Sequence, residues 1–328
     1  MASVVSPELR SLLEKFGQSH CLTWLDKGSL SGDEASSLVK QLEALDLQRI
    51  ADAFQSTKSS TTESGAIEPP DSSETLDGMD AAYRASCEAR GLAEIAEGRA
   101  AVIILGGGQG TRLGFDFPKG MYNIGLPSKK SLFQLYAERV AKLQSVVAAT
   151  SHAPVVIPLL VMTSPLNHAT TVEYFTSNNF FGLEREHVIF FPQGTLPALT
   201  SEGKIIMTSG HEVSEAPDGN GGIYNALATS GALATLENKY NTRSVHVFSV
   251  DNAICKVADP VFLGYCLMKV RLSQHVNMDA FCTPKCHLAV SLRMLKWATR
   301  SFGNLRPTKR WVWWRGAAGG QPSWSTRS

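Results

Sequence analysis

Glycines and two cations follow an apolar segment early in the sequence, in the stretch LGGGQGTRLGFDFPKG. Main-chain N–H groups of adjacent glycines can line the oxygens of a phosphate chain, because no side chain keeps the ligand away from the backbone. Arg112 and Lys119, seven residues apart, carry positive charges that could stabilise a departing pyrophosphate. The alternative interpretation is a tight strand-to-helix turn with both cations in solvent.

Two common phosphate-binding fingerprints do not fit this stretch. The ATPase loop needs G-x-x-x-x-G-K-[ST], and no lysine followed by serine or threonine stands at that spacing. The dinucleotide fingerprint G-x-G-x-x-G fails from Gly106, because Thr111 takes its last position, and from Gly108, because Leu113 does. The loop therefore predicts a triphosphate site of another kind.

Other positions have groups suited to such a site. The Gln193 amide follows an apolar segment and can both donate and accept, although a plain loop hydrogen bond is the alternative. Gly219 and Asn220 open a predicted helix, where free N–H groups favour an anion or polar ligand; the alternative is a capped helix start. Asp251 ends an apolar segment and could bind Mg²⁺ together with phosphate oxygens, or act as a turn residue.

The elements that must position these residues alternate between strands and helices. Apolar segments predict strands over 101–105, 155–163, 187–191, 204–207 and 244–250. Amphipathic segments predict helices over 131–147, 168–178 and 222–238. This order favours an α/β, Rossmann-like sheet that is mostly parallel, with helices on both faces. Ligands of such sheets bind beyond the carboxyl ends of the strands, where the glycine loop and Asp251 would lie.

Residues 1–98 predict an α-helical N-terminal region ahead of a nucleotide-binding domain over 99–269. Ser31 and Glu34 have the spacing of a capping box at the start of one helix. Residues 56–74 are rich in serine, threonine and proline, so we expect a mobile linker there.

The chain has 328 residues, of which 43% are hydrophobic, and no apolar run approaches the length of a membrane-spanning helix. The N-terminus lacks a secretory pattern, and the six cysteines are few and irregularly spaced. We therefore expect reduced thiols and a cytoplasmic location.

The last segment, residues 270–328, differs in composition from the rest. It holds ten of the 31 basic residues, one of the 30 acidic residues and five of the six tryptophans. No helical or alternating period persists in it, so we expect disorder. The alternative is a basic, tryptophan-rich module that binds nucleic acid or membrane, but we expect neither as a partner.

Four motifs carry a resemblance to a known family. LGGGQGTRLGFDFPKGMYNIGLPSKKSLFQLYAERVAKLQ resembles the signature of the UDP-sugar pyrophosphorylases, most closely the eukaryotic UDP-N-acetylhexosamine pyrophosphorylases and their pyrophosphorylase-like paralogues. FFPQGTLPAL, APDGNGGIYNAL and SVHVFSVDNAICKVADPVFLGYC are also similar and occur in the expected order. The resemblance runs from about residue 5 to Lys269, and Gly106 replaces the usual alanine.

The resemblance implies a nucleotidyltransferase that converts UTP and N-acetylglucosamine 1-phosphate into UDP-N-acetylglucosamine and pyrophosphate, with Mg²⁺. Arg112 and Lys119 would stabilise the phosphates, Gln193 would read the uracil edge, and Asp251 would bind the metal. The residues that would contact the substrates are Leu105, Gly106, Gly107, Gly108, Gly110, Thr111, Gln193, Gly219, Asn220 and Asn252.

The resemblance ends before the family's acetyl-sugar pocket. We therefore expect a C-terminally truncated form with an incomplete sheet and an exposed apolar edge. The alternative to an active enzyme is a catalytically inactive chain that only binds a uridine nucleotide or a protein partner. The preference for N-acetylglucosamine or N-acetylgalactosamine phosphate and the oligomeric state stay open.

Overall fold

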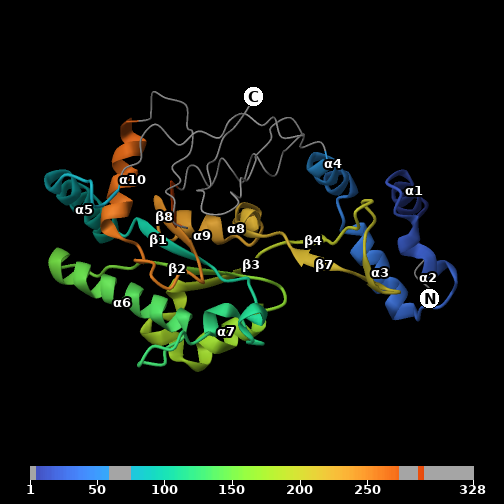
Figure 1. Cartoon of the computed structure of the whole chain (residues 1–328), viewed down its shortest axis with the longest axis horizontal. Helices are drawn as coiled ribbons and strands as arrows, with labels where there is room; N and C mark the ends of the chain where they lie inside the picture. The colour runs from blue at the N-terminus through green and yellow to red at the C-terminus, as the bar shows by residue number, and fades with distance from the viewer. Residues whose placement is uncertain (1–4, 59–74, 273–286, 292–328) are drawn as a thin grey trace. The chain divides into compact units, whose positions relative to one another are not determined.

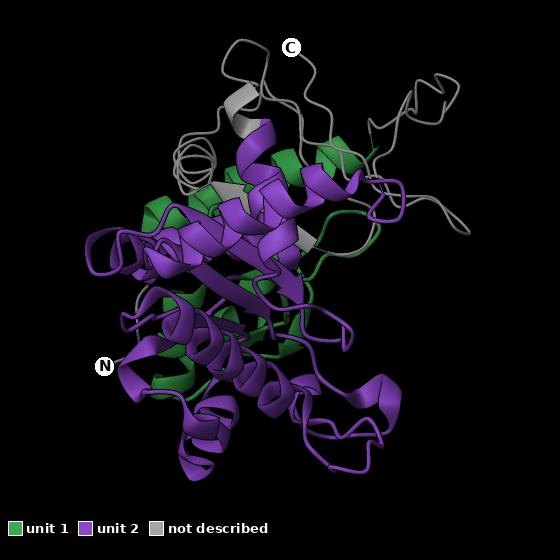
Figure 2. Ribbon diagram, turned by 90° about the vertical axis from the view of Figure 1, so that its left-hand side faces the viewer, with its two compact units in different colours: residues 1–71, 195–218 green, residues 72–194, 219–328 purple. Residues whose placement is uncertain are grey.

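The computed structural model describes residues 5–58, 75–272 and 287–291. The chain forms two compact units: residues 1–71 with 195–218, and residues 72–194 with 219–328 (Figure 2). This division differs from the boundary drawn from the sequence at residue 98. The segment 195–218 joins the N-terminal helices, and α5 (Ala81–Ala96) belongs to the second unit with α10 (Pro260–Leu272).

The first unit combines short helices with two antiparallel strand pairs. Its helices are α1 (Pro7–Lys15), α2 (Thr23–Asp26), α3 (Gly32–Glu43) and α4 (Leu47–Lys58). Its strand pairs are β4 (Thr195–Pro197) with β7 (Glu215–Pro217), and β5 (Met207–Ser209) with β6 (Glu212–Val213). The predicted capping box is confirmed, since Ser31 and Glu34 exchange side chain-to-backbone hydrogen bonds of 2.8 and 3.3 Å. Of the strand expected over 204–207, only Met207 belongs to β5 and Ile205 forms an isolated bridge with Leu199; neither joins the large sheet.

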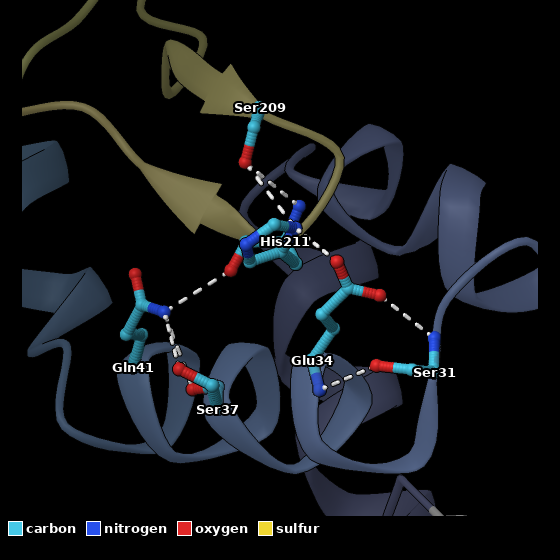
Figure 3. Close-up of polar contacts among 6 residues, drawn as sticks. All are labelled: Ser31, Glu34, Ser37, Gln41, Ser209 and His211. Carbon is cyan, nitrogen blue, oxygen red and sulfur yellow. Dashed lines mark hydrogen bonds and ion pairs between the residues drawn. The ribbon is translucent and has the colours of Figure 1, made fainter.

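Side chains of α3 hold the turn between β5 and β6 (Figure 3). Gln41 Nε2 donates to the His211 carbonyl oxygen at 3.1 Å, and Gln41 Oε1 accepts from Val213 N at 3.0 Å. His211 Nδ1 also lies 3.5 Å from a carboxylate oxygen of Glu34. These contacts explain why a segment distant in sequence belongs to the N-terminal unit.

The second unit is built around a five-stranded sheet (Figure 1). Its strands are β1 (Ala100–Leu105), β2 (Leu159–Thr163), β3 (Val188–Pro192), β8 (Ser244–Ser249) and β9 (His287–Ser291). The order is β3-β2-β1-β8-β9, with the first four parallel and β9 antiparallel to β8. The predicted mostly parallel sheet is confirmed.

Alternating residues of β1 serve opposite faces of this sheet. Val102 and Ile104 pack with α6 (Leu132–Ser151) and α7 (His168–Ser177), while Ile103 packs with α8 (Ile223–Thr229) and α9 (Ala232–Asn238) on the other face. All three side chains are completely buried. Helices therefore cover both faces, as expected for parallel strands.

Three sequence expectations change or remain open. The single helix predicted over 222–238 is two helices, α8 (Ile223–Thr229) and α9 (Ala232–Asn238), because Gly231 adopts a left-handed conformation with φ of 76°. The predicted linker lies outside the described residues from 59 to 74, and its first residues end α4. In the predicted tail, α10 extends to Leu272 and β9 is formed, but the rest lies outside the described residues, so the expected disorder stays a prediction. Within the described ranges, no helix is long and apolar enough to span a membrane.

Candidate functional site

The strand register brings several chain segments to one edge of the sheet. Leu105 is paired with Met162 of β2 and with Ser249 of β8, and Thr163 is paired with Pro192 of β3. These residues are the last or nearly the last of their strands. The loops that follow β1, β2, β3 and β8 therefore leave the sheet at the same edge, where parallel α/β proteins bind ligands.

The glycine loop after β1 folds back on itself. Lys119 N donates to Gly108 O at 3.1 Å, and Gly110 N donates to Phe117 O at 3.0 Å. A Cβ added at Gly108 would lie 3.8 Å from Lys119 Nζ, so the ammonium lies beside this glycine. Within the described residues, the N–H groups of Gly107 and Gly108 have no acceptor. The loop thus offers two unpaired N–H groups and a cation to an anion.

Lys119 also contacts the residue at the end of β8 that was predicted to bind metal. Its Nζ lies 3.3 Å from Asp251 Oδ2, and Ser249 Oγ donates to Asp251 Oδ1 at 2.6 Å. Burial favours the neutral carboxyl, but the Ser249 hydrogen bond and the Lys119 ammonium outweigh it and lower the pKa of Asp251. The carboxylate is therefore ionised at neutral pH.

Gln193 occupies the end of β3 with its side chain packed on the glycine loop. Its backbone N–H donates to Thr163 O at 2.8 Å, and the residue is 6% exposed. A Cβ added at Gly107 would lie 2.4 Å from Gln193 Nε2. The side-chain amide makes no hydrogen bond to any described residue. The amide atoms are not fully buried, so they reach solvent and are free to bond a ligand.

The other residues predicted in the loop differ in whether they are free to contact a ligand. Thr111 and Arg112 lie in an exposed 3₁₀ turn, and the Arg112 guanidinium has no ion pair with a described residue. The Gly110 N–H is occupied by Phe117 and is not available to a ligand in this conformation. Leu105 accepts a hydrogen bond from Val250 N at 3.2 Å, which joins the loop start to the end of β8.

The remaining predicted residues follow other elements. Gly219 has φ of 78°, and Asn220 begins a 3₁₀ turn that leads into the seven-residue helix α8. No hydrogen bond joins either residue to the glycine loop within the described part of the chain. Asn252 lies next to Asp251, where its N–H donates to Ser249 O at 3.0 Å. The structure thus brings Lys119, Asp251 and Asn252 together but does not link Gly219 and Asn220 to them.

Two residues of α6 hold the loop that carries Asp251, and the sequence analysis missed both roles. The buried Tyr136 hydroxyl donates to Val250 O at 2.9 Å. Arg139 Nη1 donates to Ala253 O at 2.9 Å and to Cys255 O at 3.0 Å. Their spacing of three residues places them on one face of the helix. The sequence does not show that both bind the loop after β8, because this depends on how α6 packs against the sheet.

The site has one carboxylate, that of Asp251, which suits a metal ion that is bound together with a nucleotide. The described residues contain no group of three or more histidine, cysteine, aspartate or glutamate side chains able to hold a metal. Asp251 offers one carboxylate, and its side chain is 57% exposed. Mg²⁺ commonly takes one or two carboxylates and completes its shell with phosphate oxygens and water.

The α/β unit thus gathers a glycine loop, a cation and a carboxylate at the carboxyl edge of its parallel strands, where proteins of this fold class bind ligands. Comparison with known families agrees, because the pattern described as UTP--glucose-1-phosphate uridylyltransferase matches residues 46–287. The chain belongs to this family.

Individual relatives extend this result. The chain is 42% identical over 276 residues to UDP-N-acetylglucosamine diphosphorylase 1 of Arabidopsis thaliana, covering 82% of this chain and 54% of the relative. It is 36% identical to UDP-N-acetylhexosamine pyrophosphorylase-like protein 1 of Mus musculus, covering 80% and 53%. The crystal structure of uridine diphosphate N-acetylglucosamine pyrophosphorylase from Trypanosoma brucei superposes with a TM-score of 0.74 at 27% identity, covering 98% and 74%. The chain spans about half the length of these curated relatives.

Proposed function

We propose that the carboxyl edge of the sheet binds UTP and that the chain transfers the uridylyl group to N-acetylglucosamine 1-phosphate. The observation that carries this proposal is the unpaired amide of Gln193, packed beside the free N–H groups of Gly107 and Gly108. An amide that donates and accepts matches the uracil edge, and adjacent N–H groups match phosphate oxygens. The names of the relatives support the same substrates.

The reaction needs positioning and charge neutralisation more than covalent catalysis. A phosphate oxygen of the sugar phosphate attacks the α-phosphorus in line, and the bond to the β-phosphate oxygen breaks. Pyrophosphate leaves with that electron pair. The Lys119 ammonium beside Gly108 and the unpaired Arg112 guanidinium are the groups we assign to the growing charge on the leaving group.

We propose Mg²⁺ as the cofactor, held by Asp251 and by the nucleotide phosphates. When bound, the ion supplies additional neutralisation of phosphate charge. The Lys119–Asp251 ion pair keeps both groups at the site before the ligand arrives. On ligand binding the Lys119 ammonium would contact phosphate oxygens, and the Asp251 carboxylate would be the residue that holds the ion.

We place this reaction in the cytoplasm and assign no nucleic-acid or membrane partner. The cysteines within the described ranges form no disulfide. Burial raises the pKa of the Cys21 thiol to about 11, so this thiol stays protonated at neutral pH. Buried thiols of this kind are compatible with a reducing compartment.

A second function is favoured by one specific observation. Among the described residues, the groups assigned above match a base, phosphates and a metal ion, and none is assigned to the acceptor sugar. The second candidate is therefore a chain that binds a uridine nucleotide without transferring it.

Release of pyrophosphate from UTP separates the two functions. The assay contains Mg²⁺ and N-acetylglucosamine 1-phosphate, and the matched variant is Lys119→Met, which removes the charge but retains most of the length. If the chain is a uridylyltransferase, pyrophosphate release depends on UTP, Mg²⁺ and the sugar phosphate, and it is lost in Lys119→Met. Binding of UTP without release supports the nucleotide-binding function alone.

A further inference from the structure

Asn167, in the loop after β2, is a buried residue to which the sequence analysis assigned no function. The residue is 1% exposed and immediately precedes α7. Its Oδ1 accepts from Ser164 N at 2.8 Å, which closes a local turn. Its Nδ2 donates to Gly106 O at 3.2 Å, a contact that spans 61 residues of sequence. The second contact joins this loop to the start of the glycine loop.

The chemistry of the partners fixes the orientation of the Asn167 amide. Ser164 N–H is a donor and requires the oxygen, while the Gly106 carbonyl is an acceptor and requires the nitrogen. A flipped amide would face a donor with a donor and an acceptor with an acceptor. Both contacts therefore define one side-chain position.

The contact with Gly106 also determines where the next N–H group points. Gly106 O and Gly107 N–H belong to one peptide group, and in a planar trans peptide these two groups point in opposite directions. Gly107 N–H is therefore directed away from the buried Asn167 side chain. It has no acceptor within the described residues, as expected for a group that meets a ligand.

Three consecutive glycines do not hold this orientation by themselves. Residues 106–108 lack Cβ atoms, so rotation of the peptide between Gly106 and Gly107 meets little steric resistance. Gly106 N donates to Met162 O at 2.8 Å, which anchors the residue on its other side. Among the described residues, the hydrogen bond from Asn167 Nδ2 to Gly106 O restrains the carbonyl of this peptide group.

We propose that Asn167 is a positioning residue that presents Gly107 N–H to the phosphates of the nucleotide. This inference rests on the proposed binding of UTP. Asn167 does not touch the ligand; it acts through the Gly106–Gly107 peptide. Its local turn with Ser164 is a separate, structural contact.

The substitution Asn167→Asp separates the two contacts. The carboxylate retains the shape and an oxygen for Ser164 N, but it lacks a donor for Gly106 O. Ala169→Asp is the charge control, because residue 169 is exposed in the first turn of α7 and adds the same charge without touching the glycine loop. Asn167→Thr is the second variant should Asn167→Asp fail to fold, since its hydroxyl can still accept from a turn N–H group.

Glycine labelling reads the contact directly. The protein is labelled with glycine that carries ¹³C at the carbonyl and ¹⁵N at the amide. A spectrum that selects N–H groups preceded by a labelled carbonyl then shows four signals, because Gly-Gly steps occur at 106–107, 107–108, 221–222 and 319–320. The signal that disappears in Gly106→Ala belongs to Gly107. We expect Asn167→Asp to move this signal without ligand and to leave that of Gly222 in place.

Titration with UTP and Mg²⁺ then tests the consequence. We expect the Kd of Asn167→Asp to rise about tenfold, equivalent to one lost hydrogen bond to a charged group, and that of Ala169→Asp to change less than about twofold. An unchanged Gly107 signal and an unchanged Kd in Asn167→Asp overturn the positioning role. Absence of UTP binding by the unmodified chain is a distinct result, because it overturns the proposed function itself.

Discussion

The ammonium of Lys119 and the carboxylate of Asp251 form an ion pair of 3.3 Å across 132 residues of sequence. The contact joins the end of the glycine loop to the end of β8, at the carboxyl edge of the sheet. Both groups were predicted to act on phosphate or metal, and the fold brings them into contact before any ligand binds. These two charges therefore balance each other in the absence of ligand, whereas Arg112 has no ion pair with a described residue.

Replacing Lys119 tests whether this cation serves the ligand or the fold. We expect Lys119→Met to weaken UTP binding at least about tenfold, because a charged partner of the phosphates is lost. The free energy of unfolding should change by less than about 1 kcal/mol, because both groups are partly exposed. Lys130→Met is the matched control, since Lys130 also forms a partly exposed pair with Glu138. Equal UTP affinity in the two variants would contradict the assignment of Lys119.

The lowered pKa of Asp251 predicts a specific pH dependence of stability. A carboxyl whose pKa falls on folding stabilises the folded state above its unfolded pKa, and the contribution disappears as the pH falls through the folded value. The difference in unfolding free energy between the unmodified chain and Asp251→Asn should therefore shrink below about pH 4. Urea unfolding at neutral and acid pH measures it. A difference that grows with acidification would show that Asp251 is not stabilised as a carboxylate.

Two adjacent glycines should respond differently to alanine. At Gly106 a Cβ would lie 3.1 Å from Met162 O and 3.3 Å from Phe133 Cζ, so small shifts can accommodate it. At Gly107 it would lie 2.4 Å from Gln193 Nε2 and would displace the amide assigned to uracil. We expect Gly106→Ala to retain UTP affinity within about threefold and Gly107→Ala to lose about tenfold or more. Calorimetric titration of both variants checks this; the reverse order would refute the position given to Gln193.

Removing the Tyr136 hydroxyl should loosen the loop that carries Asp251. In Tyr136→Phe the ring remains, but the Val250 carbonyl loses its donor, which costs about 1–3 kcal/mol of unfolding free energy. Burial raises the pKa of Tyr136, so the hydroxyl stays protonated and donates at neutral pH. Urea unfolding gives the cost, and the Mg²⁺ dependence of UTP binding reports the position of Asp251. A stable variant with unchanged Mg²⁺ dependence would argue against this positioning.

The strands of the second unit were predictable because local pattern and burial agree. Val102 and Ile104 on one face and Ile103 on the other lie in one apolar run that fits only a strand covered on both sides. Parallel pairing then places the loop after Leu105 and the residue Asp251 at one edge, which is why these candidates meet.

The contacts that complete the site depended on tertiary packing. Tyr136 reaches Val250 across 114 residues and depends on how α6 docks on the sheet, while Asn167 reaches Gly106 across 61 residues and depends on the pairing of β2 with β1. The segment 195–218 could not be assigned to the first unit for the same reason, since Gln41 binds its turn across 170 residues. The break at Gly231 was missed because the apolar period continues on both sides of it.

The central claim is that the edge of the sheet beside the glycine loop binds a uridine triphosphate. Calorimetric titration of the chain with UTP in Mg²⁺, with CTP as the matched ligand, tests it most directly. We predict saturable heat for UTP that is strongly reduced for CTP, because an exocyclic amino group replaces the carbonyl oxygen read by the Gln193 amide. No heat with UTP, or equal affinity for both nucleotides, would contradict the account.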